Sequence, residues 1–392
     1  MPIRLLYLVD RPIQYQAPLL RLIAGLGDID LMVVHKDAGG ADGRFDAGFG
    51  RAVTWDVPLI DGYAHQIVPE DGRLAGFIED CDVVWLHGWR GARAWRALDT
   101  ARRRGVPVLM RGENTLAAMP DGRALRGVLK RRYLKWIFDR CRAFLTVGGA
   151  NRDYYRAHGV DPGRLFPMPY AVDNDFFRSR AAAAAGERAG FRSALGLDGE
   201  GPVILFAGKL LARKNPLVLV EAFRALDHAG LGHPTLLFVG DGALRPALET
   251  AAAGDDRVRV LGFRNQTEMP AFYDLADVFV LASHREPWGL AVNEAMNGRC
   301  AIVVSGECGC AGDLVDETCG AVVAPGDSGA LARALARLLS DRGRCREMGD
   351  AAAARIRGWN FDADVDGLRQ ALAAVCRGPM RRGPVGQGPR QA

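Results

Sequence analysis

Residues 284–295, which read HREPWGLAVNEA, place two glutamates on either side of a glycine. The segment follows an apolar run and precedes a helical pattern, so we expect Gly289 at the turn where a helix begins. The first N–H groups of a helix lack intrahelical partners and its dipole favours anions, which suits a phosphate group. Glu294 could then accept hydrogen bonds from ribose hydroxyls, and Glu286 would point into a cleft. The alternative is a strand–helix junction with two solvated glutamates.

Residues 206–216, FAGKLLARKNP, form a second candidate anion site. An apolar run ends at Gly208, and a basic loop with Lys209 and Lys214 leads to Asn215 and a proline, a pattern typical of a helix start. The two lysines are among only five in the chain. A diphosphate that gains negative charge as a bond breaks needs compact cations nearby. The alternative is a solvated basic loop.

Two weaker motifs follow apolar runs in the same half of the chain. Residues 238–242, FVGDG, are typical of a strand-to-helix turn. Residues 261–266, LGFRNQ, end another predicted strand, and Phe263 and Arg264 could flank a nucleobase. Thr267 is expected to cap the helix that follows. The alternative for the second motif is an ordinary loop at a strand end.

Short apolar runs alternate with amphipathic stretches along the chain, which indicates parallel sheets covered by helices. Several runs lack polar alternation, as expected for strands buried on both faces. The predicted strands are 3–9, 31–35, 83–87, 106–110 and 143–147, and then 203–207, 235–239, 257–261, 278–282, 301–304 and 321–323. Parallel strands end at one edge of their sheet, so the motifs above would meet at that edge.

The order of these motifs resembles the C-terminal domain of glycosyltransferase family 4. The likeness is close over 203–327, where it includes CGCAGDLV at 308–315, and looser elsewhere, including FPMPYAVDNDF at 166–176 and PIQYQAPLL at 12–20. It implies an α/β protein with the GT-B fold, in which two doubly wound Rossmann-like domains face each other across a cleft. It also implies retaining transfer from a UDP- or GDP-sugar co-substrate, with no tightly bound cofactor and no metal.

The resemblance places the donor on the C-terminal domain, with Glu286 as a catalytic residue that contacts the donor sugar. The donor-binding residues would be Gly208, Lys209, Lys214, Phe263, Arg264, Gly289, Leu290 and Glu294. In this assignment the lysines neutralise the leaving diphosphate, and the turn at the helix start donates backbone N–H groups to it. The glutamate inside the helix binds the ribose.

The chain departs from the family pattern on the acceptor side. The loop at 10–16 lacks the glycines that members often carry, and no histidine follows the strand at 106–110, where many members have one near the reacting sugar. Residues 110–115, MRGENT, offer Glu113 or Asn114 in its place. His87, at the end of the strand 83–87, is a further candidate catalytic residue, although a histidine at a strand end is more often structural.

The length of 392 residues favours two domains. We expect an N-terminal Rossmann-like acceptor domain at 1–175, an interdomain linker at 176–201, and a C-terminal Rossmann-like donor-nucleotide domain at 202–355. A helix at 356–377 could cross back to the N-terminal domain. The tail at 378–392 is rich in Gly, Pro, Arg and Gln, and we expect it to be disordered because it has little to bury.

Two other functions would fit the same scaffold. A sugar-nucleotide epimerase would convert the donor without an acceptor, whereas a non-catalytic protein would bind nucleotide without turnover. A nucleic-acid partner is not expected, because the basic residues are dispersed and no recognised nucleic-acid-binding module is present.

Composition favours a cytoplasmic protein. The net charge is +5, and the apolar run at 1–9 is ended by Asp10 and Arg11, so it is too short for a signal core or a membrane span. The eight cysteines are therefore expected as free thiols. The pair Cys308 and Cys310 lacks a second pair at ligand spacing, so no metal site is predicted.

A basic stretch at 123–142 also carries interleaved apolar residues. At helical spacing it predicts a basic amphipathic helix, which could dock on an anionic membrane surface and present a lipid-linked acceptor. The alternative is a surface helix that packs its apolar face on the sheet. The acceptor itself stays open between a polysaccharide, a lipid-linked molecule and a small metabolite.

Overall fold

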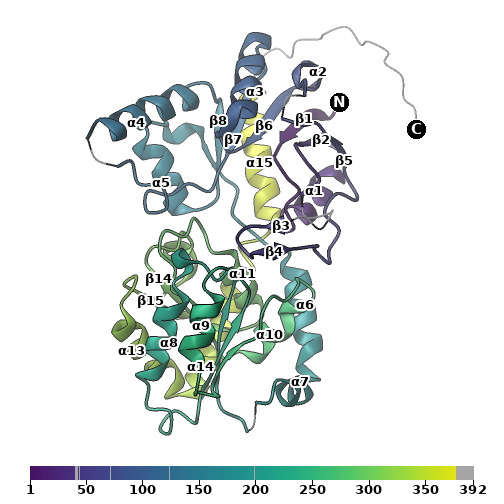
Figure 1. Cartoon of the computed structure of the whole chain (residues 1–392). Helices are drawn as coiled ribbons and strands as arrows, with labels where there is room; N and C mark the ends of the chain where they lie inside the picture. The colour runs from purple at the N-terminus through teal and green to yellow at the C-terminus, as the bar shows by residue number, and fades with distance from the viewer. Residues whose placement is uncertain (40–42, 44, 71, 123, 198, 377–392) are drawn as a thin grey trace.

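Two α/β lobes, one above the other, make up the computed structural model (Figure 1), which describes residues 1–39, 43, 45–70, 72–122, 124–197 and 199–376. The N-terminal lobe holds a seven-stranded parallel sheet in the order β5-β2-β1-β6-β7-β8-β9. Its strands are β1 (Ile3–Leu8), β2 (Ile29–His35), β5 (Ala64–Ile67), β6 (Val83–His87), β7 (Val108–Arg111), β8 (Ala143–Thr146) and β9 (Leu165–Pro167). A separate antiparallel hairpin is formed by β3 (Phe45–Asp46) and β4 (Arg51–Ala52).

Helices cover both faces of the N-terminal sheet. Because side chains alternate along a strand, Leu6 and Val84 pack on one face of the sheet, whereas Leu5 and Trp85 pack on the other. The helices are α1 (Ala17–Ala24), α2 (Ala75–Glu79), α3 (Gly91–Arg104), α4 (Ala124–Phe138) and α5 (Gly149–Ala157), and a 3-10 turn, η2 (Pro162–Arg164), precedes β9.

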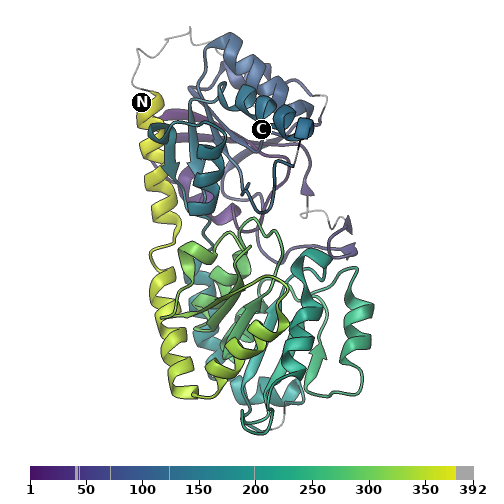
Figure 2. The same ribbon diagram turned by 90° about the vertical axis from the view of Figure 1, so that its left-hand side faces the viewer.

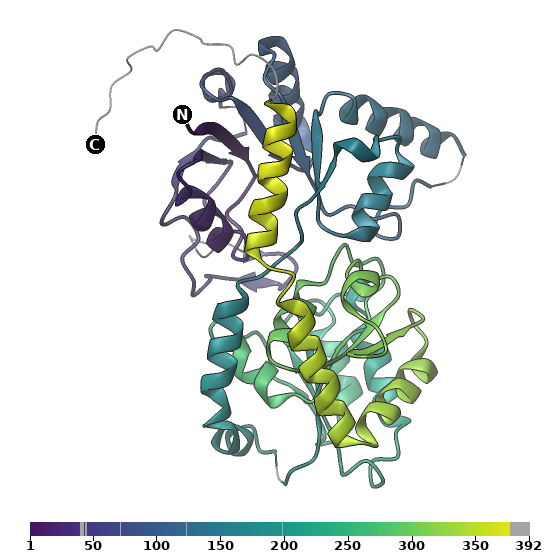
Figure 3. The ribbon, with the colours of Figure 1, turned by 180° about the vertical axis from the view of Figure 1, so that it is seen from behind.

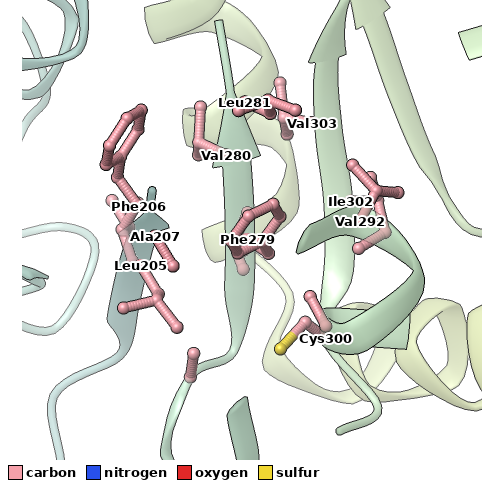
Figure 4. Close-up of a cluster of buried hydrophobic side chains, with 14 of the residues drawn as sticks. Leu205, Phe206, Ala207, Phe279, Val280, Leu281, Val292, Cys300, Ile302 and Val303 are labelled. Carbon is pink, nitrogen blue, oxygen red and sulfur yellow. The ribbon is translucent and has the colours of Figure 1, made fainter. Parts of the chain in front are cut away.

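The C-terminal lobe repeats this plan with a six-stranded parallel sheet in the order β12-β11-β10-β13-β14-β15. Figure 4 shows its apolar interior, where Leu205, Phe279 and Ile302 lie in register on three neighbouring strands. The strands are β10 (Val203–Ala207), β11 (Thr235–Val239), β12 (Val258–Val260), β13 (Val278–Leu281), β14 (Ala301–Ser305) and β15 (Gly320–Val323). The helices are η3 (Ala212–Lys214), α8 (Pro216–Arg224), α9 (Arg245–Ala252), α10 (Met269–Leu275), α11 (Leu290–Asn297), α12 (Ala311–Leu314), α13 (Ser328–Leu339) and α14 (Arg342–Ile356). The predicted pair of doubly wound Rossmann-like lobes is confirmed.

The segment expected as an interdomain linker, 176–201, is mostly helical. It contains most of α6 (Asn174–Ala185) and all of α7 (Arg188–Ala194), and α6 packs against α10 and α11 of the C-terminal lobe. Asp173 is the N-cap residue of α6, and its carboxylate accepts a hydrogen bond from the backbone N–H of Phe176 at 2.9 Å. The segment contains five consecutive alanines at 181–185, which are strong helix formers, and Ala181 is buried.

The chain returns to the N-terminal lobe through α15 (Phe361–Val375). Figures 2 and 3 show α14 and α15, in yellow, running along one side of both lobes. Val365 and Leu368 of α15 lie in the same apolar core as Leu5 and Tyr7. A Cβ at Gly367 would lie 1.7 Å from the carbonyl oxygen of Pro167, so the helix fits closely over β9 only with glycine there. The tail expected to be disordered, 378–392, lies outside the described residues.

A buried arginine–aspartate contact joins α15 to the end of β7. Arg111 Nη2 lies 3.4 Å from Asp364 Oδ1 and donates to the carbonyl oxygen of Pro169 at 3.1 Å. Both side chains are almost completely buried. Burial raises the pKa of Asp364 to about 8, and the nearby guanidinium only partly opposes this shift. The pair anchors α15 beneath the cleft-side end of the strand that leads to Glu113.

Candidate active site between the lobes

A cavity of about 500 Å³ lies between the lobes, and both contribute to its walls. Its walls include Asp10, His87 and Glu113 from the N-terminal lobe, and Arg213, Arg285 and Pro287 from the C-terminal lobe. These residues lie at or just beyond the carboxyl ends of strands in both sheets. This is the edge where α/β sheets bind their ligands.

Glycines line up where the first strands of the C-terminal sheet end. The backbone N–H of Gly208 donates to the carbonyl of Val239, and that of Gly240 donates to the carbonyl of Gly262 at 2.8 Å. A Cβ at Gly240 would lie 1.9 Å from the carbonyl oxygen of Gly208. The three turns therefore pack directly against one another, which brings the predicted diphosphate and nucleobase loops to one place.

The loop after β10 carries two cations that contact the buried carboxylate of Glu286. Lys214 Nζ lies 2.6 Å from Glu286 Oε2, and Arg213 Nη1 lies 2.7 Å from the same oxygen. A backbone hydrogen bond of 2.6 Å from His284 to Arg213 holds the two loops together. Two cations against one carboxylate leave a positive surplus beside the cavity. Glu286 and Lys214, which come from two separate motifs, therefore lie in contact, and one oxygen of the carboxylate is already engaged by both cations.

Lys209 crosses to the other lobe. Its ammonium lies 2.9 Å from both carboxylate oxygens of Asp46 in β3 and 4.8 Å from the centre of the Phe49 ring. Burial raises the pKa of Asp46, but the hydrogen bond and charge of Lys209 outweigh burial, so this pKa is lowered. The predicted cation thus lies between the lobes, with a carboxylate as its present partner.

Gly289 is the turn predicted before α11. Its φ of 105° is in the region that favours glycine, and a Cβ there would lie 2.7 Å from the Leu281 side chain. Leu290 is the first residue of α11, so its N–H is among those that a helix leaves without an intrahelical partner. The predicted glycine turn before α11 is thus confirmed, and whether it binds an anion stays a prediction.

Glu294 lies in the second turn of α11 beside Tyr273 of α10. The tyrosine hydroxyl donates to Glu294 Oε2 at 2.5 Å. Burial raises the pKa of Glu294 from its usual 4.5 to about 7, and the hydrogen bond from Tyr273 opposes the shift. A carboxyl whose pKa is shifted this far by burial is a candidate functional residue.

The nucleobase loop follows β12. Phe263 is half-buried and lies edge to face with Phe49 of the N-terminal lobe, with ring centres 4.9 Å apart. Arg264 contacts Glu268 at 3.6 Å. Thr267 does not cap α10 as predicted, because its N–H and hydroxyl donate to Asp56 of the N-terminal lobe and Glu268 occupies the cap position.

The N-terminal wall of the cavity brings His87 and Glu113 together. His87 Nε2 lies 3.7 Å from Glu113 Oε1, and His87 Nδ1 lies 2.9 Å from the Tyr7 hydroxyl. Tyr7 donates to Gln16 Oε1 at 2.6 Å, which leaves its oxygen to accept from Nδ1. Burial raises the pKa of Glu113, but hydrogen bonds from His87 and Tyr170 outweigh it, so the pKa is lowered.

Several residues of the site were not predicted from the sequence. Arg213 was visible beside Lys214 as a second cation in one loop. Asp46 and Phe49 lie in a stretch without a motif, so nothing local marked them. Tyr170 donates to Glu113, and its carbonyl accepts from Asn293 of α11 at 2.9 Å, which links the lobes across the cleft.

Two family models match successive parts of the chain. Residues 15–171 match the glycosyl transferase 4-like domain, and residues 187–355 match glycosyl transferases group 1. A D-inositol 3-phosphate glycosyltransferase of Xylanimonas cellulosilytica is 32% identical over 316 residues, which cover 76% of this chain and 74% of the relative. An alpha-D-kanosaminyltransferase of Streptomyces kanamyceticus is 30% identical over 215 residues, 54% of each chain. Both relatives are named as transferases, which does not support the epimerase alternative.

Solved structures share the fold at lower identity. The Anabaena protein Alr3699/HepE, in complex with UDP and glucose, superposes with a TM-score of 0.73 at 15% identity and covers 95% of this chain and 100% of its own. A sucrose-phosphate synthase from Thermosynechococcus elongatus superposes with a TM-score of 0.69 at 20% identity, with 95% and 100% covered. The two-lobed arrangement is therefore that of known GT-B proteins.

Proposed function

The chain belongs to glycosyltransferase family 4 and is a GT-B glycosyltransferase, and we propose that it transfers a sugar from a UDP-sugar to a phosphate-bearing acceptor with retention of anomeric configuration. The observation that carries the proposal is the cationic cluster of Lys214 and Arg213 beside the Gly289 turn, at a cavity that both lobes enclose. UDP is favoured over GDP because the Anabaena protein with this fold was solved with UDP and glucose.

The donor diphosphate would lie against the C-terminal lobe. Gly208 lets the backbone approach it, Lys209 and Lys214 balance its charge, and the N–H groups of Gly289 and Leu290 donate to it. Breaking the bond between sugar and phosphate leaves negative charge on the diphosphate, so fixed positive charge there lowers the barrier. These groups stay in place as the bond breaks.

The rest of the donor would contact three further elements. Glu294 would accept from the ribose hydroxyls, and Phe263 and Arg264 would flank the base. Both cations of the charge cluster contact Oε2 of Glu286, so we assign its other oxygen, Oε1, to a hydroxyl of the donor sugar.

The acceptor would occupy the cavity on the N-terminal side. His87 Nε2 and Glu113 lie where an acceptor hydroxyl would approach the donor sugar, and we propose that they orient it. Arg90 and Arg285 also line the cavity and would pair with an acceptor phosphate. The name of the Xylanimonas relative, an inositol 3-phosphate glycosyltransferase, supports an acceptor of this class.

The proposal is tested by supplying UDP-sugars with a phosphorylated polyol, and with the same polyol lacking its phosphate. We expect acceptor-dependent UDP release with the phosphorylated compound and a product whose anomeric configuration, read by NMR, equals that of the donor. An inverted product would contradict retention, and equal rates with both polyols would contradict the phosphate assignment. Conversion of the donor without acceptor would indicate an epimerase, and binding without turnover a non-catalytic protein.

We further propose a cytoplasmic enzyme that associates peripherally with anionic membrane. Cys308 and Cys310, like the other cysteines, are free thiols. Within the described part of the chain, no helix is long and apolar enough to cross a bilayer. Helix α4 projects at the edge of the N-terminal lobe in Figure 1. It buries Leu134 and Ile137 against the lobe, but it also carries apolar side chains on its solvent side, where Leu125 and Leu129 are 71% and 57% exposed.

The outward side of α4 combines the two features that interfacial binding requires. Its exposed leucines are interleaved with the exposed Arg126, Arg131 and Arg132. We expect the protein to sediment with vesicles that contain anionic lipid, less so at high salt, and not with neutral vesicles. Replacement of Leu125 and Leu129 by serine should weaken sedimentation without lowering turnover of a water-soluble acceptor. Equal sedimentation with anionic and neutral vesicles, unchanged by the two serine substitutions, would refute this mode of membrane association.

A further inference from the structure

The hairpin segment, residues 45–56, belongs to the N-terminal lobe in sequence but contacts the C-terminal lobe. Figure 1 shows β3 and β4 between the lobes, outside both large sheets. Asn265 Nδ2 donates to the carbonyl of Thr54 at 2.8 Å, and the Thr267 N–H donates to Asp56 at 3.1 Å. The hairpin is therefore attached to the loop after β12, where the nucleobase is proposed to bind.

Phe49 bridges the two proposed ends of the nucleotide. Its ring centre lies 4.8 Å from the ammonium of Lys209, the proposed diphosphate ligand, and 4.9 Å from the ring of Phe263, the proposed base ligand. Trp55 and Arg51 also approach Phe263, at 6.2 and 5.1 Å. Aromatic side chains therefore lie between the proposed diphosphate ligand Lys209 and the proposed base ligand Phe263, where the nucleoside would bind.

Asp46 of the hairpin contacts Lys209, the proposed diphosphate ligand. Both its oxygens lie 2.9 Å from Lys209 Nζ, and Oδ1 also accepts from the N–H of Gly48 at 2.8 Å. A Cβ at Gly48 would lie 2.6 Å from the Lys209 side chain, so the lysine passes close to the hairpin backbone at this glycine. The carboxylate holds the same cation that the donor diphosphate is proposed to need.

We propose that the hairpin segment is the N-terminal wall of the donor site, with Phe49 packing on the nucleoside and Asp46 holding Lys209 until the diphosphate replaces it. This inference rests on the proposed function, since it assigns a second lobe to the same donor. A diphosphate carries more charge than one carboxylate, so it displaces Asp46 from Lys209, while the contacts of Thr54 and Asp56 with the loop after β12 keep the hairpin against the nucleoside. The donor is then enclosed by both lobes, which excludes water from the reacting sugar.

The proposal is tested by calorimetric binding of UDP and of inorganic pyrophosphate to the full-length protein. Phe49→Ala should weaken UDP binding about tenfold (about 1.4 kcal/mol) and leave pyrophosphate within about twofold, because aromatic side chains bind bases through stacking and pyrophosphate has no base. Asp46→Asn should tighten both ligands at least threefold, since it removes the competing charge but keeps the oxygen that accepts from Gly48. Phe45→Ala is the matched control, because Phe45 lies in the same hairpin and is 67% exposed.

Unchanged UDP affinity in Phe49→Ala, or an equal loss in Phe45→Ala, would overturn the role of Phe49. Equal or weaker pyrophosphate binding in Asp46→Asn would overturn the role of Asp46. Phe49→Leu, which keeps apolar bulk without a flat ring, replaces Phe49→Ala if the latter melts at a lower temperature than wild type. Failure of the wild-type protein to bind UDP would instead refute the proposed donor, so the two failures are distinguishable.

Discussion

Replacing Lys214 with alanine is expected to lower kcat by about 10²–10³-fold, the range found when one fixed donor to a developing anion is removed. Lys214 is the less exposed of the two cations on Glu286, with 12% of its side chain exposed against 44% for Arg213. In a site that excludes water, a fixed charge of this kind has its largest effect on the charge that develops as the bond breaks. Steady-state rates of UDP release measure the effect.

Arg213→Ala is the matched control for this result, because Arg213 contacts the same carboxylate oxygen from the more exposed side. Its kcat should fall less than about tenfold, since an exposed charge is screened by solvent. Thermal unfolding of both variants shows whether Glu286, left with a single partner, destabilises the lobe. Near wild-type turnover in a folded Lys214→Ala variant would show that Lys214 does not stabilise the leaving diphosphate.

Donor binding is expected to weaken as the pH falls through about 7, because Glu294 would lose the carboxylate that accepts from the ribose. Between pH 4.5 and about 7, Glu294 is protonated in the folded protein but ionised in the unfolded chain, because burial raises its pKa from 4.5 to about 7. In the free enzyme, stability from this group is therefore present below pH 4.5 and is lost as the pH rises towards 7. Donor binding favours the opposite state, so UDP affinity should rise over the same interval.

Glu294→Ala should weaken UDP binding about 10–150-fold, the equivalent of one hydrogen bond to a charged group. Tyr273→Phe is the sharper control, because the Tyr273 hydroxyl lowers the pKa of Glu294 and its loss should move the pH midpoint upward. Calorimetric titrations with UDP between pH 5.5 and 8.5 would record both effects. A pH profile that Glu294→Ala leaves unchanged would assign the titration to another group.

The central strands could be predicted from the sequence because burial on both faces makes them continuous apolar runs. Strands β6, β10 and β11 begin and end at the predicted residues. The edge strand β5 was missed, because it is largely exposed and its residues carry no apolar pattern. The hairpin β3–β4 was missed because its strands are two residues long and largely exposed, so they carry no apolar pattern. Its contacts are with the other lobe, which local sequence does not show.

The C-terminal half of the site was predictable because its residues lie in short motifs at strand ends, where Gly208 and Gly289 mark the turns. The partners of the lysines were not predictable. Asp46 lies 163 residues before Lys209, and only the closure of one lobe on the other brings the two together. Sequence spacing reports neighbours along one element, whereas such contacts depend on how two separately folded sheets dock.

The seating of α15 on the first lobe has a practical consequence for dissecting the protein. The chain passes between the lobes twice, so the N-terminal lobe is built from two separate stretches of sequence, whereas the C-terminal lobe is continuous. A fragment that ends after β9 would lack α15, which packs on β8 and β9, and would leave uncovered the side of the core that Leu368 of α15 shares with Leu145 of β8. Exchange of donor halves between related enzymes would therefore have to carry the last helix with the acceptor half, although it is encoded at the opposite end.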